Sequence, residues 1–212
     1  MAERTVEDRL REQYFDLLPD IRRVAEELEA EVRFCLLPIS LKLDRYERLV
    51  VSSRIKECES AVNALRRRQE GATFDREQPD LYVLTGLKDL AGVRVSVFPR
   101  KRCEETRLEI RRRFADWEPD PVLDENGHLL AHKYFGYCKA SNKVRGEFQV
   151  LPMLTSLFWE VEHAAIYKPT PKLKGVAGHP KMKDRANQVA AALKAFEEEF
   201  EMLIGRDPLG ET

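Results

Sequence analysis

Apolar side chains recur at three- and four-residue steps along much of this chain, a spacing that predicts amphipathic helices. The first stretch covers residues 6–37, where Pro19 is expected to divide it into two helices and Pro38 to mark its exit. Further helices are expected over residues 55–70, 99–117, 152–168 and 181–204. The apolar stripe of the last helix consists of Val189, Ala192, Leu193, Phe196, Phe200 and Leu203. Helices are thus expected at both ends of the chain.

Alternation of apolar and polar positions predicts strands between these helices. In residues 92–98, three valines alternate with Gly92, Arg94 and Ser96, a pattern that indicates a half-buried strand. Asp89 stands at the entrance to this strand.

The other expected strands are short. Residues 49–51 form one, and residues 129–140 and 144–151 form a hairpin around Ser141-Asn142. The resulting order of helices and strands predicts an α/β (α+β) fold, in which helices flank a small mixed sheet.

Composition limits the class of protein. The chain has 212 residues, 43% apolar and 34% charged, with a net charge of -1, which suits a single domain and argues against coating nucleic acid through overall charge. The cysteines are widely spaced without a C-x-x-C pair, which is typical of reduced cytosolic thiols. No apolar run approaches the roughly 20 residues of a membrane span, and the charged N-terminus lacks a signal-peptide core. We therefore expect a soluble, cytoplasmic protein without membrane attachment.

Two carboxylates, one at the entrance of a predicted strand and one on another, indicate a possible catalytic site. An aspartate at the mouth of a strand, as Asp89 is, is a usual Mg²⁺ ligand, and Glu147 shares one face of a second strand with Gln149. Arg54 and Lys56 lie upstream. This combination indicates a site for a metal-bound polyphosphate, and hence phosphoryl or nucleotidyl transfer.

Other patterns carry less information when each is taken alone. If a helix begins near Arg54, Lys56 and Ser60 lie four residues apart on one face, where side chains and free N–H groups can hold phosphate. Gly136 lies among aromatic residues and would permit the close approach of a flat ring, and Tyr137 could stack on a base. Solvated charges and ordinary core aromatics would give the same patterns.

The ordered combination of motifs is more specific. Along the chain follow R-I-K-x-x-x-S, K-D-L-A-G-V-R-V, K-x-F-G-Y, E-F-Q-V and E-V-E-H-A-A-I-Y-K. This set resembles the synthetase domain of the RelA/SpoT family, over residues 45–170, and implies its nucleotidyltransferase-like fold. Residues 1–44 would be N-terminal helices and residues 171–212 a C-terminal loop and amphipathic helix of the same domain, as in the small alarmone synthetases, including toxic ones.

The resemblance implies an activity and a donor site. The family transfers pyrophosphate from ATP to the 3′-hydroxyl of an acceptor nucleotide, usually GDP or GTP, which yields the alarmones of the stringent response. Arg54, Lys56 and Ser60 would bind ATP. Asp89 and Glu147 would hold Mg²⁺, and Glu147 would also help to deprotonate the attacking hydroxyl.

The acceptor side follows from the same resemblance. Tyr137 would stack on the acceptor base, and Lys133 would lie near the acceptor phosphates. Gln149, Arg94 and His163 would support the site.

The chain departs from the family on this acceptor side. Ser141 stands where a histidine is usual, Leu151 and Pro152 replace an Arg-Thr pair, and Ala64 replaces a lysine. These changes remove cations that would bind acceptor phosphates.

Three hypotheses are compatible with these departures. Lys139, Lys143 or Arg145 replaces the missing cations in a working synthetase. Alternatively, the acceptor is an adenine nucleotide or the 3′ end of tRNA, bound through a wider basic surface. That surface would consist of Arg111, Arg112, Arg113, Lys172 and Lys174. In the third hypothesis the chain is a catalytically weakened nucleotide-binding or interaction module.

Possible partners also follow from the resemblance. A toxic member would have an antitoxin protein, and small alarmone synthetases often form homo-oligomers, for which the stripe of residues 181–204 is available. A purely structural, partner-binding protein is the hypothesis from a different class.

Overall fold

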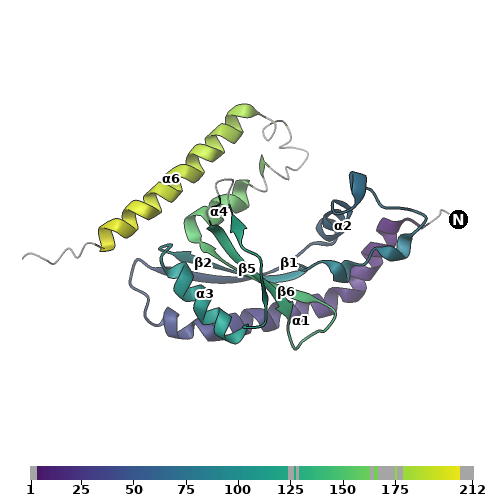
Figure 1. Cartoon of the computed structure of the whole chain (residues 1–212), viewed down its shortest axis with the longest axis horizontal. Helices are drawn as coiled ribbons and strands as arrows, with labels where there is room; N and C mark the ends of the chain where they lie inside the picture. The colour runs from purple at the N-terminus through teal and green to yellow at the C-terminus, as the bar shows by residue number, and fades with distance from the viewer. Residues whose placement is uncertain are drawn as a thin grey trace, which may run out of the picture.

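The computed structural model describes residues 4–123, 127, 129–162, 165–166, 175 and 179–205. A six-stranded sheet in the order β1-β2-β6-β5-β3, with β4 paired to β5, forms its centre (Figure 1). The strands are β1 (Arg48–Ile55), β2 (Ala91–Phe98), β3 (Glu118–Pro119), β4 (Val122–Leu123), β5 (Leu129–Tyr137) and β6 (Arg145–Pro152). The helices are α1 (Val6–Ser40), α2 (Cys58–Arg66), α3 (Arg102–Arg113), α4 (Met153–Glu162) and α6 (Pro180–Gly205). Because β2 and β6 run parallel and the other pairs antiparallel, the predicted mixed sheet is confirmed.

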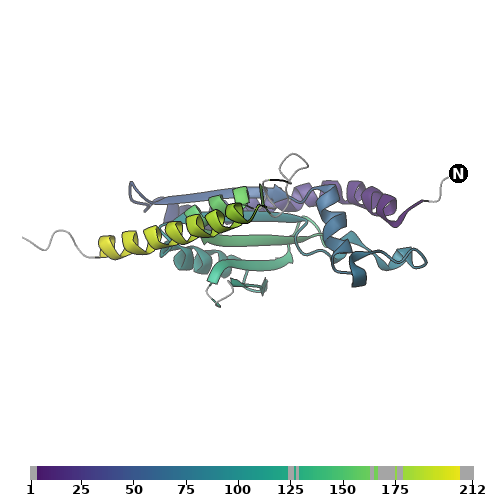
Figure 2. The ribbon, with the colours of Figure 1, turned by 90° about the horizontal axis from the view of Figure 1, so that it is seen from above.

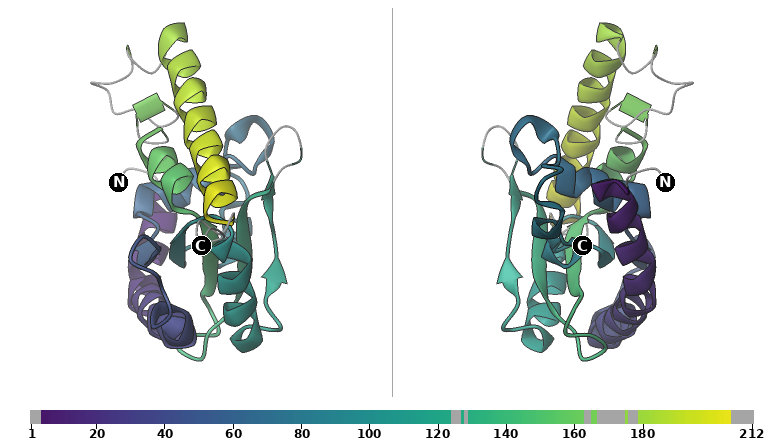
Figure 3. Two further views of the ribbon diagram at one scale, coloured as in Figure 1. Left: turned by 90° about the vertical axis from the view of Figure 1, so that its left-hand side faces the viewer. Right: turned by 90° about the vertical axis from the view of Figure 1, so that its right-hand side faces the viewer.

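The helices lie on opposite sides of the sheet, as the end-on views show (Figure 3). α1 and α3 cover one face, and α4 and α6 lie on the other side. The core between the sheet and the first pair includes Leu28, Val32, Leu36, Val93, Val95, Ile110, Phe114, Phe148 and Val150. Seen from above, α2 lies at the end where α1 begins, and α6 extends toward the opposite end (Figure 2).

α1 is a single helix of 35 residues, so the predicted division at Pro19 is wrong. Thr5 and Asp8 form a capping box at its start. Proline has no N–H group, so the carbonyl of Phe15, four residues earlier, lacks its usual helical hydrogen bond. Pro19 and Phe15 are both exposed, so water can supply the missing hydrogen bond. The buried residues before and after Pro19 pack on the same core and hold the helix together.

The helix expected over residues 55–70 begins later than predicted. β1 pairs with β2 along its full length through Ile55, and α2 begins only at Cys58. Arg54 therefore lies on a strand and Lys56 in the connection that follows, rather than together on one helix. Ala61, Val62 and Leu65 form the buried face of α2, as predicted, whereas Ile55, which was expected on the same face, lies at the end of β1 and is exposed.

β2 is buried on both faces, whereas a half-buried strand was expected. It lies between β1 and β6, and α4 covers part of its polar side, where the hydroxyl oxygens of Ser96 and Ser156 are 3.0 Å apart. Its valines face the α1 side, as the alternation predicts. β2 is thus the central strand of the molecule.

The predicted hairpin of β5 and β6 is confirmed. In its connection, the buried Ser141 Oγ accepts hydrogen bonds from the N–H groups of Lys143 at 3.1 Å and Val144 at 3.3 Å. Leu151 is buried on β6. Two of the positions that depart from the family motifs therefore stabilise the turn and the core.

Gly136 permits the close approach of a flat ring, as predicted, but this ring is the chain's own Trp117. A Cβ atom at position 136 would lie 2.4 Å from both Cδ1 and Nε1 of Trp117. Trp117 is buried and packs edge-on against Phe114, with ring centroids 4.9 Å apart. Gly136 therefore makes room for the ring of Trp117 in the core, and this ring fills the space that a nucleotide base would need.

Gly136→Ala is expected to destabilise the protein by about 1–3 kcal/mol or more, because the ring of Trp117 must leave its packed position. Urea unfolding, followed by tryptophan fluorescence and circular dichroism, would measure the change in the free energy of unfolding. Gly86→Ala is the matched control, since its Cβ would meet nothing within 4 Å. Equal effects of the two substitutions would contradict this packing.

α6 contacts the rest of the molecule through few residues of its predicted apolar stripe. Ala186 and Glu197 are buried, and the ring of Phe200 lies 5.0 Å from that of Phe98 at the end of β2. The stripe residues Val189, Ala192, Phe196 and Leu203 are exposed. Within the single chain these residues stay exposed because α6 packs against α4 and, through Phe200, against the end of β2. None of the helices in the described part of the chain has the length and hydrophobicity of a membrane span.

Candidate active site

The strand register brings predicted site residues of several strands onto one face of the sheet. Arg54 on β1 pairs with Gly92 on β2, and Gly92 pairs with Glu147 on β6. Glu147 pairs with Phe135 on β5, which pairs with Glu118 on β3. Paired positions share a face, as do positions two residues apart on a strand. The adjoining rows on this face contain Arg94, Gln149, Lys133, Arg145 and Tyr137.

Glu147 is the buried centre of this face, with its side chain only 1% exposed. It forms an ion pair with Arg54, and Lys133 Nζ lies 3.6 Å from its Oε1. Gln149 Nε2 donates a hydrogen bond to the same oxygen at 2.7 Å. A buried carboxylate is costly unless it is paired and hydrogen-bonded, and here both oxygens are engaged. The structure thus joins four predicted residues in one cluster.

Gly92 makes room for the ion pair between Arg54 and Glu147, which flank it on the two neighbouring strands. A Cβ atom at this position would lie 3.3 Å from Arg54 Nε and 3.4 Å from Glu147 Oε2. The nearest atom to this Cβ would be the backbone oxygen of Glu147 at 3.2 Å, and this distance and the one to Arg54 are tighter than most real contacts, so a larger residue would crowd both the strand and the guanidinium. The glycine in this strand therefore has a positioning role that the sequence pattern did not reveal.

Lys56 and Asp89 form a second ion pair beside this cluster. Two hydrogen bonds fix the backbone of Lys56. The N–H group of Lys56 donates to the carbonyl oxygen of Leu90 at 2.9 Å, and Tyr14 Oη donates to the carbonyl oxygen of Lys56 at 2.8 Å. Burial lowers the pKa of Lys56, and the partnership with Asp89 opposes that effect. Burial would raise the pKa of Asp89, but the ammonium of Lys56 and the charge of Arg54 outweigh it, so the pKa is lowered and Asp89 is ionised at neutral pH.

Asp89 has the oxygen that a divalent cation needs. Its Oδ1 is buried and has no hydrogen-bond partner among the described residues, while Oδ2 binds Lys56. Mg²⁺ in proteins is commonly held by one or two carboxylates, with water and substrate phosphates completing the octahedron. Among the described residues no three His, Cys, Asp or Glu side chains gather as a metal site. The residues therefore fit a Mg²⁺ ion that arrives with a polyphosphate, and Asp89 has the carboxylate that could hold it.

A further ionic cluster lies at the edge of the same face, around Glu118. Lys88 Nζ and Arg145 Nη2 lie 2.9 Å from its two different carboxylate oxygens. The guanidinium of Arg145 also lies 5.4 Å from the centre of the ring of Tyr137, and Lys88 Nζ lies 5.7 Å from that of Phe135. Tyr137 is 54% exposed, so a planar ligand can reach its ring. We call Lys88, Glu118, Tyr137 and Arg145 the rim cluster.

Sequence reasoning missed three contributors to this region. Lys88 directly precedes Asp89, which was an available signal. Glu118 falls in a stretch that reads as a loop, and only the pairing of β3 with β5 brings it to the sheet. Tyr14 lies on the buried face of α1, and its hydroxyl group reaches Lys56 only because α1 crosses the connection after β1.

The remaining supporting residues lie at the border of the site. Arg94 forms an ion pair with Glu160 of α4 and so ties that helix to the sheet face. Ser60 lies in the first turn of α2 and is half-buried, and its hydroxyl group forms no hydrogen bond with the ionic clusters among the described residues. His163 lies outside the described residues.

Lys139 and the arginines of α3 are placed elsewhere. Lys139 follows β5 in the hairpin connection, where its N–H donates to Glu27 of α1 at 3.2 Å. Arg113 pairs with Glu31 of α1, and Arg112 with Glu109. Arg111 donates to the carbonyl groups of Phe114 and Trp117. Since α1 and α3 cover the opposite face, these cations do not join the site, and the basic surface expected from residues 111–113 is not continuous with it.

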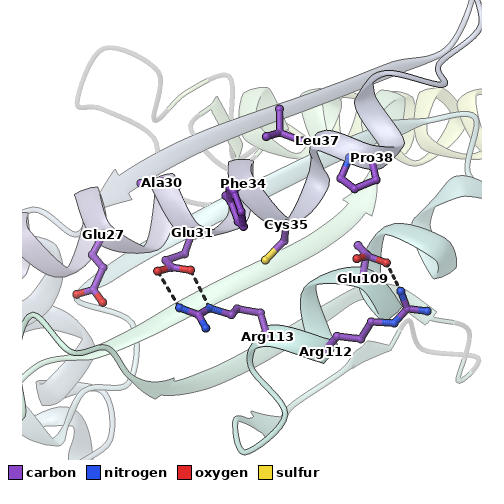
Figure 4. A pocket seen from close by; sticks show the side chains of 10 residues that line it. All are labelled: Glu27, Ala30, Glu31, Phe34, Cys35, Leu37, Pro38, Glu109, Arg112 and Arg113. Atoms are coloured by element: carbon purple, nitrogen blue, oxygen red, sulfur yellow. Dashed lines mark hydrogen bonds and ion pairs between the residues drawn. The ribbon is translucent and has the colours of Figure 1, made fainter.

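A groove between α1 and α3 occupies this opposite side (Figure 4). Its walls carry the pairs of Glu31 with Arg113 and of Glu109 with Arg112, and Phe34 and Cys35 lie along α1. The two ion pairs neutralise four of the five charged groups here, and the fifth, Glu27, accepts hydrogen bonds from the N–H groups of Lys139 and Ala140. None of the motif residues lines the groove. The polar sheet face therefore remains the candidate active site.

Comparison with solved structures identifies the architecture. The structure is similar to that of small alarmone synthetase 1 from Bacillus subtilis bound to AMPCPP, with a TM-score of 0.62, 20% identity, and coverage of 92% of this chain and 97% of that one. The form bound to its product pppGpp gives a TM-score of 0.66 at 17% identity with the same coverage. No protein-family model matches the sequence, and no curated protein matches it at a significant level. The chain thus has the RelA/SpoT-type synthetase fold of the small alarmone synthetases.

Proposed function

We propose that this protein is a pyrophosphokinase, which transfers the terminal diphosphate of ATP to the 3′-hydroxyl of an acceptor nucleotide. The observation that carries the proposal is the arrangement of Glu147, Arg54 and Lys133 beside the pair of Lys56 and Asp89. A buried carboxylate, a second carboxylate with a free oxygen and several cations on one face suit phosphoryl chemistry. The fold shared with small alarmone synthetases supports the same class of reaction.

The chain's own residues would divide the work between donor and acceptor. Arg54 and Lys56 would exchange their carboxylate partners for the phosphates of ATP, which frees Asp89 and Glu147. Mg²⁺, held by Asp89, would neutralise charge on the phosphates during transfer. Glu147 would accept the proton of the acceptor's 3′-hydroxyl group while the hydroxyl oxygen forms a bond to the β-phosphorus of ATP. The bond between the β-phosphorus and the oxygen that bridges it to the α-phosphorus breaks at the same time, and AMP leaves with that oxygen.

The single test is a transfer assay with ATP labelled at the β- or the γ-phosphate. The acceptors are GDP, GTP, ADP, ATP and deacylated tRNA, each with Mg²⁺. Both labels are expected to appear together on the acceptor, whereas a kinase that moves one phosphate would transfer the γ-label alone. Binding of an ATP analogue without transfer to any acceptor would instead support a nucleotide-binding module. The predicted homo-oligomer and antitoxin remain predictions.

Gly92→Ala is expected to lower transfer by about 10-fold, because the added methyl group pushes Arg54 away from its position over β2. Because the added Cβ would also lie 3.2 Å from the backbone oxygen of Glu147, the neighbouring strand must shift slightly, and the free energy of unfolding should fall by about 1–3 kcal/mol. Steady-state kinetics and urea unfolding would be measured side by side, with Gly86→Ala as the control in open space. Unchanged kinetics would show that the position of Arg54 beside Gly92 is not needed for transfer.

A further inference from the structure

The carbonyl group of Lys56 needs a hydrogen-bond partner from outside its own segment. Lys56 lies in the short connection between β1 and α2, directly before Glu57, the N-cap of α2. The first hydrogen bond of this helix runs from the N–H group of Ala61 to the carbonyl oxygen of Glu57 at 2.9 Å, so the carbonyl of Lys56 has no place in the helix. Tyr14 of α1 supplies the partner, because its hydroxyl group donates to this oxygen at 2.8 Å.

Packing fixes the position of the Tyr14 hydroxyl group. The side chain is 5% exposed and lies in the core that α1 shares with α2 and with the segment before β2. Leu10 and Ile21 of the same helix and Leu90 of that segment are completely buried in this core. Burial raises the pKa of Tyr14, so the hydroxyl group keeps its proton and remains a donor. Tyr14 therefore presents a fixed donor to the connection after β1.

The neighbouring residue of α1 holds the segment that leads to Asp89. Gln13 Oε1 accepts a hydrogen bond at 2.8 Å from the N–H group of Leu84, which begins the turn before Asp89. The N–H group of Lys56 donates to the carbonyl oxygen of Leu90, the residue directly after Asp89. One turn of α1 thus holds both of the segments whose side chains form the pair of Lys56 and Asp89.

We propose that Tyr14 is a positioning residue for the donor nucleotide: by fixing the peptide of Lys56, its hydroxyl group keeps the Lys56 ammonium beside Asp89, where both can meet a metal-bound polyphosphate. This inference rests on the proposed function, in which Lys56 turns from Asp89 to the phosphates of ATP. The ammonium is a compact charge on a flexible four-carbon stem, so the place of the backbone decides what it can reach. Without the hydroxyl group the carbonyl of Lys56 loses its partner, and the connection must move to find another.

Tyr14→Phe removes this hydroxyl group and keeps the ring. Isothermal titration of the full chain with α,β-methylene ATP and Mg²⁺ should show about 10-fold weaker binding to this variant than to the wild type. Tyr82→Phe is the matched control, because Tyr82 is buried in the same core and its hydroxyl group accepts a hydrogen bond from the N–H group of Asp75 at 2.9 Å. The midpoint of urea unfolding should fall in both variants, whereas only Tyr14→Phe should weaken binding.

A double-mutant cycle tests whether Tyr14 acts through Lys56. Lys56→Met should weaken binding of the analogue by at least about 10-fold, because it removes the ammonium. Tyr14→Phe in the Lys56→Met background should weaken binding no further, since the group that Tyr14 positions is then absent. A merely structural role of Tyr14 would instead give the same loss in both backgrounds.

The outcomes separate this proposal from the proposed function. Equal affinities of Tyr14→Phe and Tyr82→Phe, or full additivity in the cycle, would overturn the positioning role and leave pyrophosphate transfer in place. Binding that depends on Tyr14 through Lys56, together with no transfer to any acceptor, would leave the positioning role standing and refute the enzymatic function. A wild type that does not bind the analogue would overturn both.

Discussion

Glu147→Gln is expected to lower the rate of diphosphate transfer by about 10³-fold, because the substitution removes the group that accepts the proton of the attacking hydroxyl. The amide has the shape of the carboxylate, and its oxygen can still accept the hydrogen bond from Gln149. At 1% exposure of Glu147, water has little access to replace the lost base. The measurement is the single-turnover rate with labelled ATP and saturating acceptor, together with the affinity for an ATP analogue, which should change little.

A matched control separates catalysis from the loss of an ion pair. Glu160 pairs with Arg94 on the same side of the sheet, but it lies on α4 and outside the cluster around Glu147. Glu160→Gln is therefore expected to change the rate by no more than about threefold. A rate for Glu147→Gln above one-tenth of wild type would remove Glu147 from its assigned role. Circular dichroism and urea unfolding must show that both variants are folded before the rates are compared.

Local patterns in the sequence were sufficient to predict β2, β5 and β6, which carry most of the site. The alternation through residues 92–98 and the two-residue spacing of Glu147 and Gln149 each specify which side chains share a face. The hairpin of β5 and β6 then places Lys133 and Tyr137 on that face, because antiparallel pairing preserves it. The ordered motifs led to the correct fold through their resemblance to the RelA/SpoT synthetase domain.

The rest depends on contacts between distant segments, which periodicity does not contain. Arg54 has helix-compatible neighbours, and only the pairing of β1 with β2 draws it onto a strand. Lys139 follows Tyr137 by two residues, but the strand ends before it and the chain turns toward Glu27 of α1. Glu118 reaches the site through a strand of two residues, too short to leave an alternating pattern. Local preference is overridden at each of these points by tertiary pairing.

α6 shows how strongly such contacts can oppose a sequence pattern. Its expected apolar stripe is largely exposed, while Glu197 on another side of the helix is completely buried. Neither carboxylate oxygen of Glu197 has a hydrogen-bond partner of normal geometry among the described residues. Burial raises the pKa of Glu197 to about 7, and the nearby Arg100 guanidinium and Leu154 N–H only partly oppose this effect. A carboxyl group in this position is protonated in mildly acidic solution and ionised in alkaline solution.

Glu197→Gln is therefore expected to stabilise the protein at pH 8 by roughly 3 kcal/mol and to have little effect near pH 4.5. The pKa of Glu197 is higher in the folded chain, so between its ordinary value of 4.5 and about 7 the folded state binds a proton that the unfolded state has released. The contribution of Glu197 to the stability of the wild type consequently falls as pH rises through this window and is constant above it. Glutamine is neutral throughout and avoids this loss.

The measurement is the difference in the free energy of unfolding between Glu197→Gln and wild type at several pH values from 5 to 8. Taking this difference cancels the titration of every group that the two proteins share. Glu198→Gln, on the exposed side of the same helix, is the control and should give a difference near zero. A flat difference for Glu197→Gln across this range would mean that the carboxyl group is solvated in solution, and hence that α6 does not dock as the structure places it.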